Sequence, residues 1–474
     1  MSSVSGLNSL LSSSSASPTG IDLSALLEAA TGASSEGIDV NAAVNAAITA
    51  AEAPEQSWQS QQTILQNQNT ALQALQTDAT NLDNDVQALN SITGPLSAVT
   101  VSSSNSSIVS ATAASGSAVG THVIQVGNLA STASWESDTV TNASTPLAAG
   151  SFTITGATGT VTTISTGTGT STLADVATTI NGDDLGVTAN VVTDANGSRL
   201  EIVSNASGSA ANFSVLPATG GSLDFSQAVL GANASVTVDG IDLSSASNTV
   251  TGAIPGVTLN LLNASPGTNV SLTISPDTTQ AATAINQFVT DYNTAITALN
   301  AQFSDTGSGE GPLAGDSVVR NLQSDLQSAL DYVNTPASGT TTVSTLASLG
   351  ISVGSTGTLT VDNATLQSAL QNNFSDVQTF FQGTALNGFA NALDQQLTNF
   401  ISPADGAFTV DLQSLNTQYT DLQTDITNFQ TNYIAPLKTQ LNSEYSKAEI
   451  LLQQLPTEMA QIDQELGFNT KSGS

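Results

Sequence analysis

The 474-residue sequence contains no cysteine, which excludes disulfide bonds, zinc thiolate sites and thiol catalysis. Basic residues are also scarce, since five Lys and Arg stand against 38 Asp and Glu and give a formal net charge of −33. A field of this sign repels phosphate backbones and anionic lipid headgroups, so we expect no nucleic-acid partner. Charged residues make up only 9% of the chain. Its surface must therefore consist mostly of Ser, Thr, Asn, Gln and Gly.

Long apolar runs are missing as well. The longest apolar-looking tract, residues 42–53, is interrupted by Asn45, Thr49 and Glu52, and no run reaches the roughly 18 residues of a membrane span. The first Lys or Arg after Met1 is Arg199, whereas a cleaved secretory signal needs a basic start. We therefore expect a soluble protein with no membrane insertion and no cleaved signal peptide. The lack of cysteine favours a destination outside the cell.

Catalytic and metal-binding patterns are scarce. The single histidine, His122, lies in a strand-like segment and has no clear partners for acid–base or metal chemistry. Residues 194–197 faintly resemble a calcium loop but lack the other EF-hand ligands, so a hairpin turn is the better interpretation. No nucleotide-binding or hydrolase motif is present. We predict no enzyme activity, no cofactor and no metal.

The two tryptophans could be ligand platforms. Trp58 lies seven residues before Leu65 in an apolar stripe, so we interpret it as helical core. Trp135 follows a strand-like segment, and its exposure stays open.

Apolar stripes with spacings of three and four residues mark both ends of the chain. The N-terminal stripe contains Leu65, Gln68, Leu72, Leu75, Ala79, Leu82, Val86 and Leu89. The C-terminal stripe contains Leu412, Leu415, Tyr419, Leu422, Ile426, Phe429 and Tyr433, and after an expected break at Pro436 it resumes through Tyr445, Ala448, Leu452, Leu455, Met459, Ile462 and Leu466. The apolar stripe of an isolated helix would be exposed to water, so each stripe must pack against the other or against a neighbouring subunit.

Residues 99 to 276 are rich in residues that favour strands and turns, whereas both chain ends carry helical stripes. We therefore predict an α+β multidomain fold. A helical coiled-coil or bundle stalk is made from both chain ends, and a β-rich two-domain head is inserted between them. Shorter helices are expected at 172–180, capped by Ser171, and at 363–381 and 386–400. The expected divisions are a disordered or weakly helical arm at 1–45, stalk at 46–98, head at 99–145, inserted outer head at 146–231, head at 232–276, stalk at 277–435 and a coiled-coil tail at 436–474.

Several segments resemble one family in the same order along the chain. They include Ala234–Leu243 (ASVTVDGIDL), Leu272–Asp277 (LTISPD), Ile285–Asn293 (INQFVTDYN), Pro312–Ser317 (PLAGDS), Gly357–Asp362 (GTLTVD) and, upstream, Gly120–Ala130 (GTHVIQVGNLA). The family is that of bacterial flagellar filament cap proteins, hook-associated protein 2. Residues 173–204 also resemble a module of flagellins and hook-associated proteins.

The resemblance implies a ring-forming homo-oligomer at the extracellular tip of the flagellum, where exported flagellin subunits fold and insert. It also implies type III export without a cleaved signal, contacts with hook–filament junction proteins, and docking of an export chaperone on the C-terminal helix. An alternative is a surface adhesin that binds a glycan or host surface through its β head, around Trp135 and residues 150–170.

Overall fold

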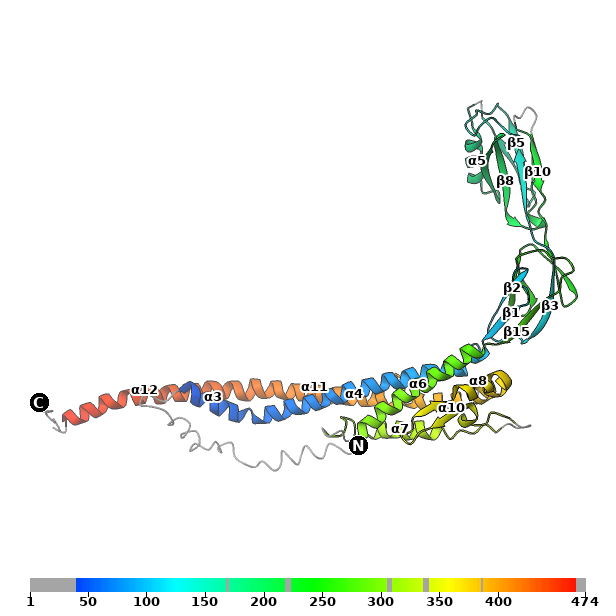
Figure 1. The fold of residues 1–474 in the computed structure, drawn as a ribbon. Coiled ribbons are helices and arrows are strands. Elements are labelled where there is room, and N and C mark those ends of the chain that lie inside the picture. The colour runs from blue at the N-terminus through cyan, green and yellow to red at the C-terminus, as the bar shows by residue number, and fades with distance from the viewer. Residues whose placement is uncertain are drawn as a thin grey trace. The chain divides into compact units, whose positions relative to one another are not determined.

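The computed structural model describes residues 40–167, 170–217, 223–304, 309–335, 341–384 and 387–465. Helices at both ends of the chain flank a β-rich middle (Figure 1), which confirms the predicted α+β class. The chain divides into two compact units. Unit 1 comprises the described parts of Met1–Thr80, Thr294–Asp325 and Gln396–Ser474, and unit 2 comprises those of Asn81–Asn293 and Leu326–Gln395.

Two consecutive helices, α3 (Val40–Ala51) and α4 (Ala53–Asn90), form the N-terminal part of the described chain. Pro54 is the second residue of α4, where its missing N–H costs no helical hydrogen bond. The helix α4 begins in unit 1 and ends in unit 2. The apolar positions of its stripe from Leu65 to Leu89 are buried, while Gln68 at the same spacing is not.

The C-terminal helices are joined by a π-helical turn, Gln430–Ile434, between α11 (Ala407–Phe429) and α12 (Ala435–Glu465). The expected break at Pro436 does not occur. Pro436 has no backbone N–H to donate to the helix, but the wider π-helical turn just before it keeps the helix continuous. In this turn the Ala435 N–H donates to the Gln430 carbonyl, five residues earlier. The extra residue shifts the seam, so Ile434 is buried at 8% exposure while Tyr433 is 47% exposed.

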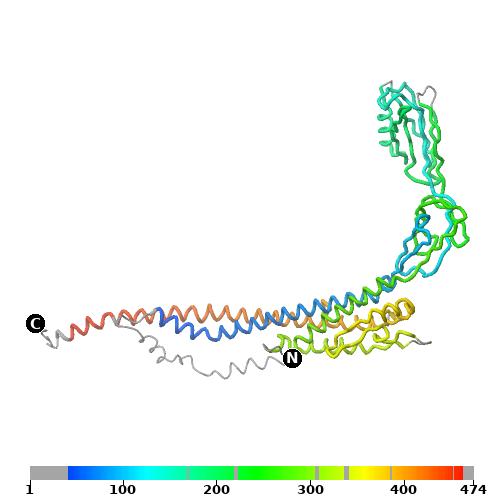
Figure 2. Tube along the Cα trace, viewed as in Figure 1, coloured from blue at the N-terminus to red at the C-terminus, as the bar shows by residue number. Residues whose placement is uncertain are grey.

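Within unit 1, α3 packs on α12. Val44 and Ile48 form a buried cluster with Ile434, and Leu437 and Leu441 pack against it. Figure 2 shows α3 in blue beside the orange and red trace of α11 and α12. The second half of the C-terminal seam therefore pairs with α3 over a short stretch.

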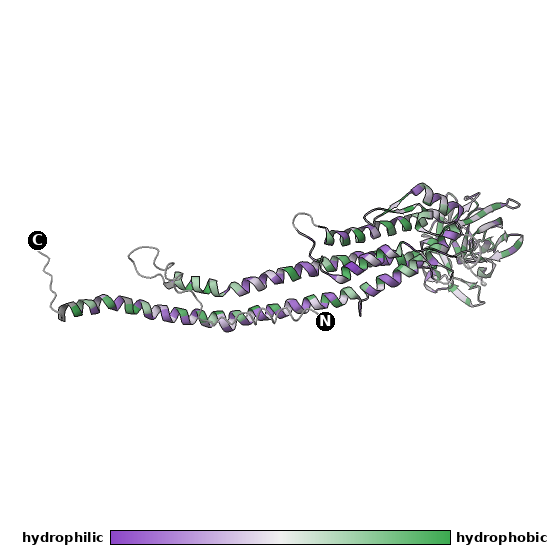
Figure 3. Cartoon of the chain, turned by 90° about the horizontal axis from the view of Figure 1, so that it is seen from below, coloured by the Kyte–Doolittle hydropathy of each residue, from purple (hydrophilic) through white to green (hydrophobic). Residues whose placement is uncertain are grey.

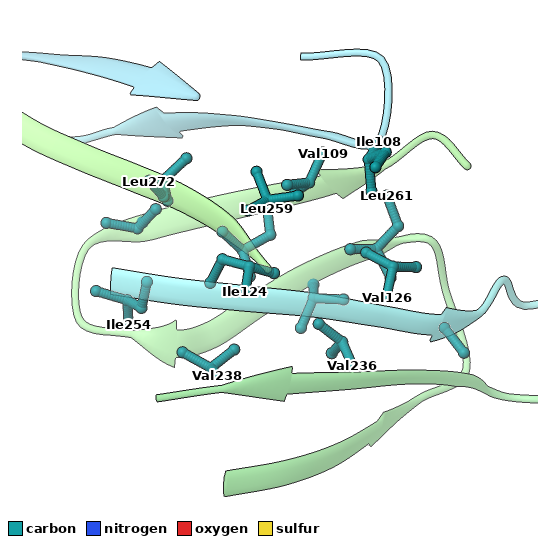
Figure 4. Close-up of a cluster of buried hydrophobic side chains, with 14 of the residues drawn as sticks. Ile108, Val109, Ile124, Val126, Val236, Val238, Ile254, Leu259, Leu261 and Leu272 are labelled. Atoms are coloured by element: carbon teal, nitrogen blue, oxygen red, sulfur yellow. The ribbon is translucent and has the colours of Figure 1, made fainter. Parts of the chain in front are cut away.

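The inner β subdomain belongs to unit 2 and contains two sheets. The five-stranded sheet has the order β1 (Val99–Ser103), β15 (Val270–Pro276), β3 (Gly120–Asn128), β11 (Ala234–Val238), β12 (Ile241–Ser245), and the smaller one the order β13 (Thr249–Ile254), β14 (Val257–Leu261), β2 (Val109–Ala113). Alternate residues of their strands, such as Val236 and Leu259, point into one buried cluster (Figure 4).

The outer β subdomain, also in unit 2, has its own core. One sheet has the order β10 (Phe225–Val229), β4 (Thr132–Ser137), β8 (Gly197–Ser207), β7 (Val187–Asp194), and the other the order β6 (Val161–Ser165), β5 (Ser151–Thr155), β9 (Ser214–Pro217). Helix α5 (Leu173–Gly182) buries Leu173, Val176 and Ile180 in this core. Its cap is Thr172 rather than Ser171, because Thr172 and Asp175 form a reciprocal capping box.

The remaining helices follow the β-rich part. They are α6 (Thr278–Phe303), α7 (Ser317–Ala329), α8 (Asn363–Asn372), α9 (Phe374–Gln382) and α10 (Phe389–Ile401), and the short strands β16 (Ile351–Val353) and β17 (Leu359–Val361) form a hairpin. The expected helix 363–381 is two helices, because Asn373 leaves helical geometry at φ −135° and ψ 35°. In unit 2, Phe288, Phe380, Phe381 and Phe389 form a buried aromatic core.

Candidate interaction surfaces

The single histidine, His122, interacts with an aspartate in the turn between β11 and β12. His122 Nδ1 lies 2.7 Å from Asp239 Oδ2, and the Val123 backbone N–H donates to Asp239 Oδ1 at 2.8 Å. The hydrogen bond with His122, followed by that from Val123, lowers the pKa of Asp239. Asp239 and Gly240 both have positive φ (52° and 83°) in the hairpin between β11 and β12. His122 thus ties β3 to this turn.

The weak calcium-like segment is a hairpin turn between β7 and β8. Asp194 Oδ1 accepts the Asn196 N–H at 2.7 Å, and this bond is the main reason that the pKa of Asp194 is lowered. Arg199 bridges Asp194 Oδ2 at 2.6 Å and Glu136 Oε2 at 3.1 Å. In the described part of the chain, no three His, Cys, Asp or Glu residues gather in a way that could hold a metal ion.

Both tryptophans are used within the fold. Trp58 packs edge-on against Phe429 with ring centroids 5.3 Å apart, inside unit 1. Trp135 lies within β4 rather than after a strand, is half-buried, and donates its Nε1–H to the Phe213 carbonyl at 3.0 Å. The indole of Trp135 therefore offers no free N–H edge to a ligand.

The N-terminal stripe faces the inside of the chain. All of its candidate residues are at most 3% exposed: Leu72, Leu75, Leu82, Val86 and Leu89. Burying each such side chain contributes roughly 1.5 to 3 kcal/mol. These leucines and the valine are therefore core residues of the single chain.

The candidate residues on α11 are less covered. On α11 only Ile426 is buried, and the others are half-buried: Leu412, Leu415, Tyr419, Leu422 and Phe429. Tyr433, in the π-helical turn that follows α11, is exposed. Polar bonds join α11 to α4 within unit 1, with Gln66 Nε2 donating to the Tyr419 hydroxyl at 2.9 Å and Gln62 Nε2 donating to Gln423 Oε1 at 3.0 Å. A groove of about 340 Å³ lies along this contact and is lined by Leu65, Leu415 and Tyr419 among others. This α11 face keeps part of its apolar area accessible.

The end of α12 exposes a strip of large apolar side chains. Those described are Ile450, Leu451, Leu455, Met459 and Ile462, each between 49% and 62% exposed. Figure 3 shows hydrophobic positions recurring along this helix up to its last turns. The candidate residue Leu466 and the side chain of Leu452 lie outside what the structure describes. No described helix is long and apolar enough to cross a membrane.

Sequence reasoning missed two carboxyl pairs in the helical part of unit 2. Asp83 on α4 interacts with the carboxyl group of Asp394 on α10, and Asp85 on α4 interacts with that of Asp291 on α6. Burial, reinforced by the partner carboxyl, raises the pKa of Asp83 to about 7, and the same causes raise that of Asp85 to about 7. The sequence does contain a signal for these pairs, because Asp83 and Asp85 directly adjoin the apolar stripe residues Leu82 and Val86.

Sequence comparison connects the chain with flagellar proteins. Sequence models described as flagellar hook-associated protein 2 N-terminus and C-terminus match residues 36–133 and 231–457. A third, the flagellin hook IN motif, matches residues 151–206, which lie in the outer β subdomain.

Individual relatives agree with these matches. The B-type flagellar hook-associated protein 2 of Pseudomonas aeruginosa is 30% identical over 254 residues, 51% of this chain and 50% of the relative. That of Salmonella typhimurium is 28% identical over 231 residues, 45% of this chain and 48% of the relative. The chain thus matches about half the length of these curated relatives.

A solved structure extends the similarity to the fold. The D1-D2-D3 domains of the flagellar cap protein FliD from Escherichia coli align with a TM-score of 0.57 and 27% identity, over 73% of this chain and 99% of that chain. The similarity therefore includes helical and β-rich parts together.

Proposed function

The chain belongs to the flagellar hook-associated protein 2 family, and from this premise we propose that it caps the bacterial flagellar filament. It acts as an oligomeric ring at the filament tip and promotes the folding and insertion of exported flagellin subunits. The work is steric, with no covalent catalysis and no cofactor. Its place is extracellular, after export without a cleaved signal peptide.

The observation that carries this proposal is the alignment with the flagellar cap protein of Escherichia coli over almost all of that chain. The matched segments at 36–133 and 231–457 lie on either side of the outer β subdomain. A cap needs elements that grip the filament and elements that cover growing subunits, and a chain with helices at both ends and a β-rich middle supplies both.

We assign the parts of the cap as follows. The legs are residues 46–98 and 277–435, with an arm at 1–45 and a tail at 436–474. The head is formed by residues 99–145 and 232–276, with an outer portion inserted at 146–231. The half-buried face of α11 from Leu412 to Phe429 makes ring contacts with the next subunit, because it retains accessible apolar area next to α4.

The end of α12 supplies the second contact surface. Its exposed residues Leu455, Met459 and Ile462 bind an export chaperone before secretion and flagellin or hook–filament junction proteins afterwards. Recognition of an amphipathic helix through such spaced anchors suits partners that offer an apolar groove.

The test is deletion of the gene in its source bacterium and complementation with the intact gene. The expected result is short or absent filaments with flagellin released into the medium, and full filaments after complementation. Normal filaments in the deletion strain, with loss of surface adhesion alone, would support the adhesin alternative. In the described part of the β head, the Trp135 indole N–H donates to the Phe213 carbonyl and so is not free to bind a glycan.

A further inference from the structure

The end of α4 carries two acids whose side chains face other acids. Asp83 is only 5% exposed, and its Oδ2 accepts a hydrogen bond from Gln87 Nε2 at 2.7 Å. Its Oδ1 is fully buried and has no hydrogen-bond donor among the described residues, and the carboxyl group of Asp394 is the acidic group that acts on it. Two carboxylates cannot bond to each other, so this contact is a hydrogen bond only when one member holds a proton.

The second pair repeats the arrangement on another side of the same helix. Asp85 Oδ2 is buried without a donor in the described structure, and its side-chain partner is Asp291. Asp291 in turn accepts from Gln287 Nε2 at 3.0 Å on its own helix. The pairs stand two residues apart on α4 and reach two different helices, α10 and α6.

Within the part of the chain that the structure describes, no Lys, Arg or His forms an ion pair with these acids. Among the described residues, the titratable groups that face them are Asp394 from α10 and Asp291 from α6. The neighbouring α9 contributes a neutral amide, Gln382, which donates to the Leu89 and Ser91 carbonyls. The ion pairs of the described residues involve only His122 and Arg199, both in the β-rich part. The choice at each pair is therefore between a shared proton and two adjacent negative charges.

We propose that the two carboxyl pairs form a proton-dependent clamp, in which one proton per pair holds the end of α4 against α10 and α6 and loss of both protons loosens it. The sign follows from linkage: the folded state holds protons that the unfolded chain releases near its ordinary aspartate pKa. The clamp is complete in mild acid, and its contribution is lost as pH rises to about 7, the folded pKa of Asp83 and Asp85. The inference is independent of the capping role, because it concerns only the single chain.

The test is hydrogen exchange of the full chain at about pH 5.5 and about pH 8.5, corrected for intrinsic exchange and run with a chelator so that metal binding cannot replace protons. The wild-type amides of residues 82–90 should open at least about tenfold more often at the higher pH, since one pKa unit corresponds to tenfold. Amides in the inner β subdomain provide the internal reference.

The informative variants are Asp394→Asn and Asp291→Asn, alone and together. Each amide keeps the shape of the protonated acid and donates permanently to its α4 partner, so the pH response of opening should fall at least about threefold in the double variant, while burial of Asp83 and Asp85 leaves a residual dependence. Asp421→Asn, at an exposed position on α11, removes the same charge and should leave the wild-type response intact. Single variants that each give a smaller pH response than the wild type provide a second readout if the double variant does not fold.

Infrared difference spectra between the two pH values give a direct measure of the protons. The wild type should show a protonated carboxyl band near neutral pH that weakens in the double variant. A wild-type exchange profile that does not change with pH, or an undiminished response in the Asn variants, would overturn the clamp.

Discussion

Ser131 and Ala232 face each other in an isolated antiparallel bridge, with the Ser131 N–H donating to the Ala232 carbonyl at 2.9 Å and the Ala232 N–H returning to the Ser131 carbonyl at 3.3 Å. The outer β subdomain, from β4 to β10, lies between these two residues in the chain. Its core is distinct from that of the inner subdomain. The bridge thus marks a point where the chain leaves one core and returns to it.

The first prediction is that removal of residues 132–231, with a short Gly-Ser linker between Ser131 and Ala232, leaves the inner subdomain folded. Both ends are already joined by hydrogen bonds, so a short loop closes at little entropic cost. The shortened protein should keep cooperative unfolding and should restore filaments in the deletion strain. Deletion of residues 140–230 is the matched comparison. It should give a less stable protein, because β4 remains without the two strands that it pairs with, β8 and β10.

The second prediction concerns the π-helical turn. Ile434→Ala should lower the free energy of unfolding by about 2 kcal/mol or more, because it empties a buried site shared with Val44 and Ile48. Tyr433→Ala should cost much less, since Tyr433 is exposed. Urea unfolding followed by helical circular dichroism measures both. A strict seven-residue seam would reverse the order, so a larger loss for Tyr433→Ala contradicts the turn.

The third prediction concerns the strip on α12. The double variant Leu455→Ala and Ile462→Ala should change the free energy of unfolding by no more than about 0.5 kcal/mol, because both side chains are about half exposed. Binding to a purified flagellar export chaperone of the source bacterium should weaken, and capping should fall with it. Gln454→Ala, an exposed polar position on the same helix, is the control. Unchanged chaperone binding together with normal filaments would show that the strip does not bind the proposed partners.

The fourth prediction concerns the turn held by His122. Asp239→Ala should lower the free energy of unfolding by about 1 kcal/mol more than Asp239→Asn, because Asn tolerates positive φ and can still accept from the Val123 N–H. In the wild type, the lowered pKa of Asp239 means that its contribution is present above the unfolded aspartate pKa and fades as pH falls through the folded one. Thermal unfolding between pH 3 and 7 measures this, and equal curves for both variants would contradict it.

The sequence alone determined the order of helices and strands, because periodicity and turn residues act locally. The alternation of Ala234, Val236 and Val238 marks one face of a strand, and the pair Asp239 and Gly240 marks the turn that follows it. The same local rules placed the stripe of α4, whose leucines are buried. The family resemblance was likewise carried by short segments in a fixed order.

Only the tertiary structure decided which partner each residue meets. The π-helical turn moves the seam from Tyr433 to Ile434, since one extra residue rotates every later side chain around the helix. The pairing of Asp83 with Asp394 joins residues more than 300 positions apart in the chain, and no local pattern encodes it. Burial and pKa are properties of the assembled surroundings, so the proton-holding pairs emerge only when α4, α6 and α10 are packed together.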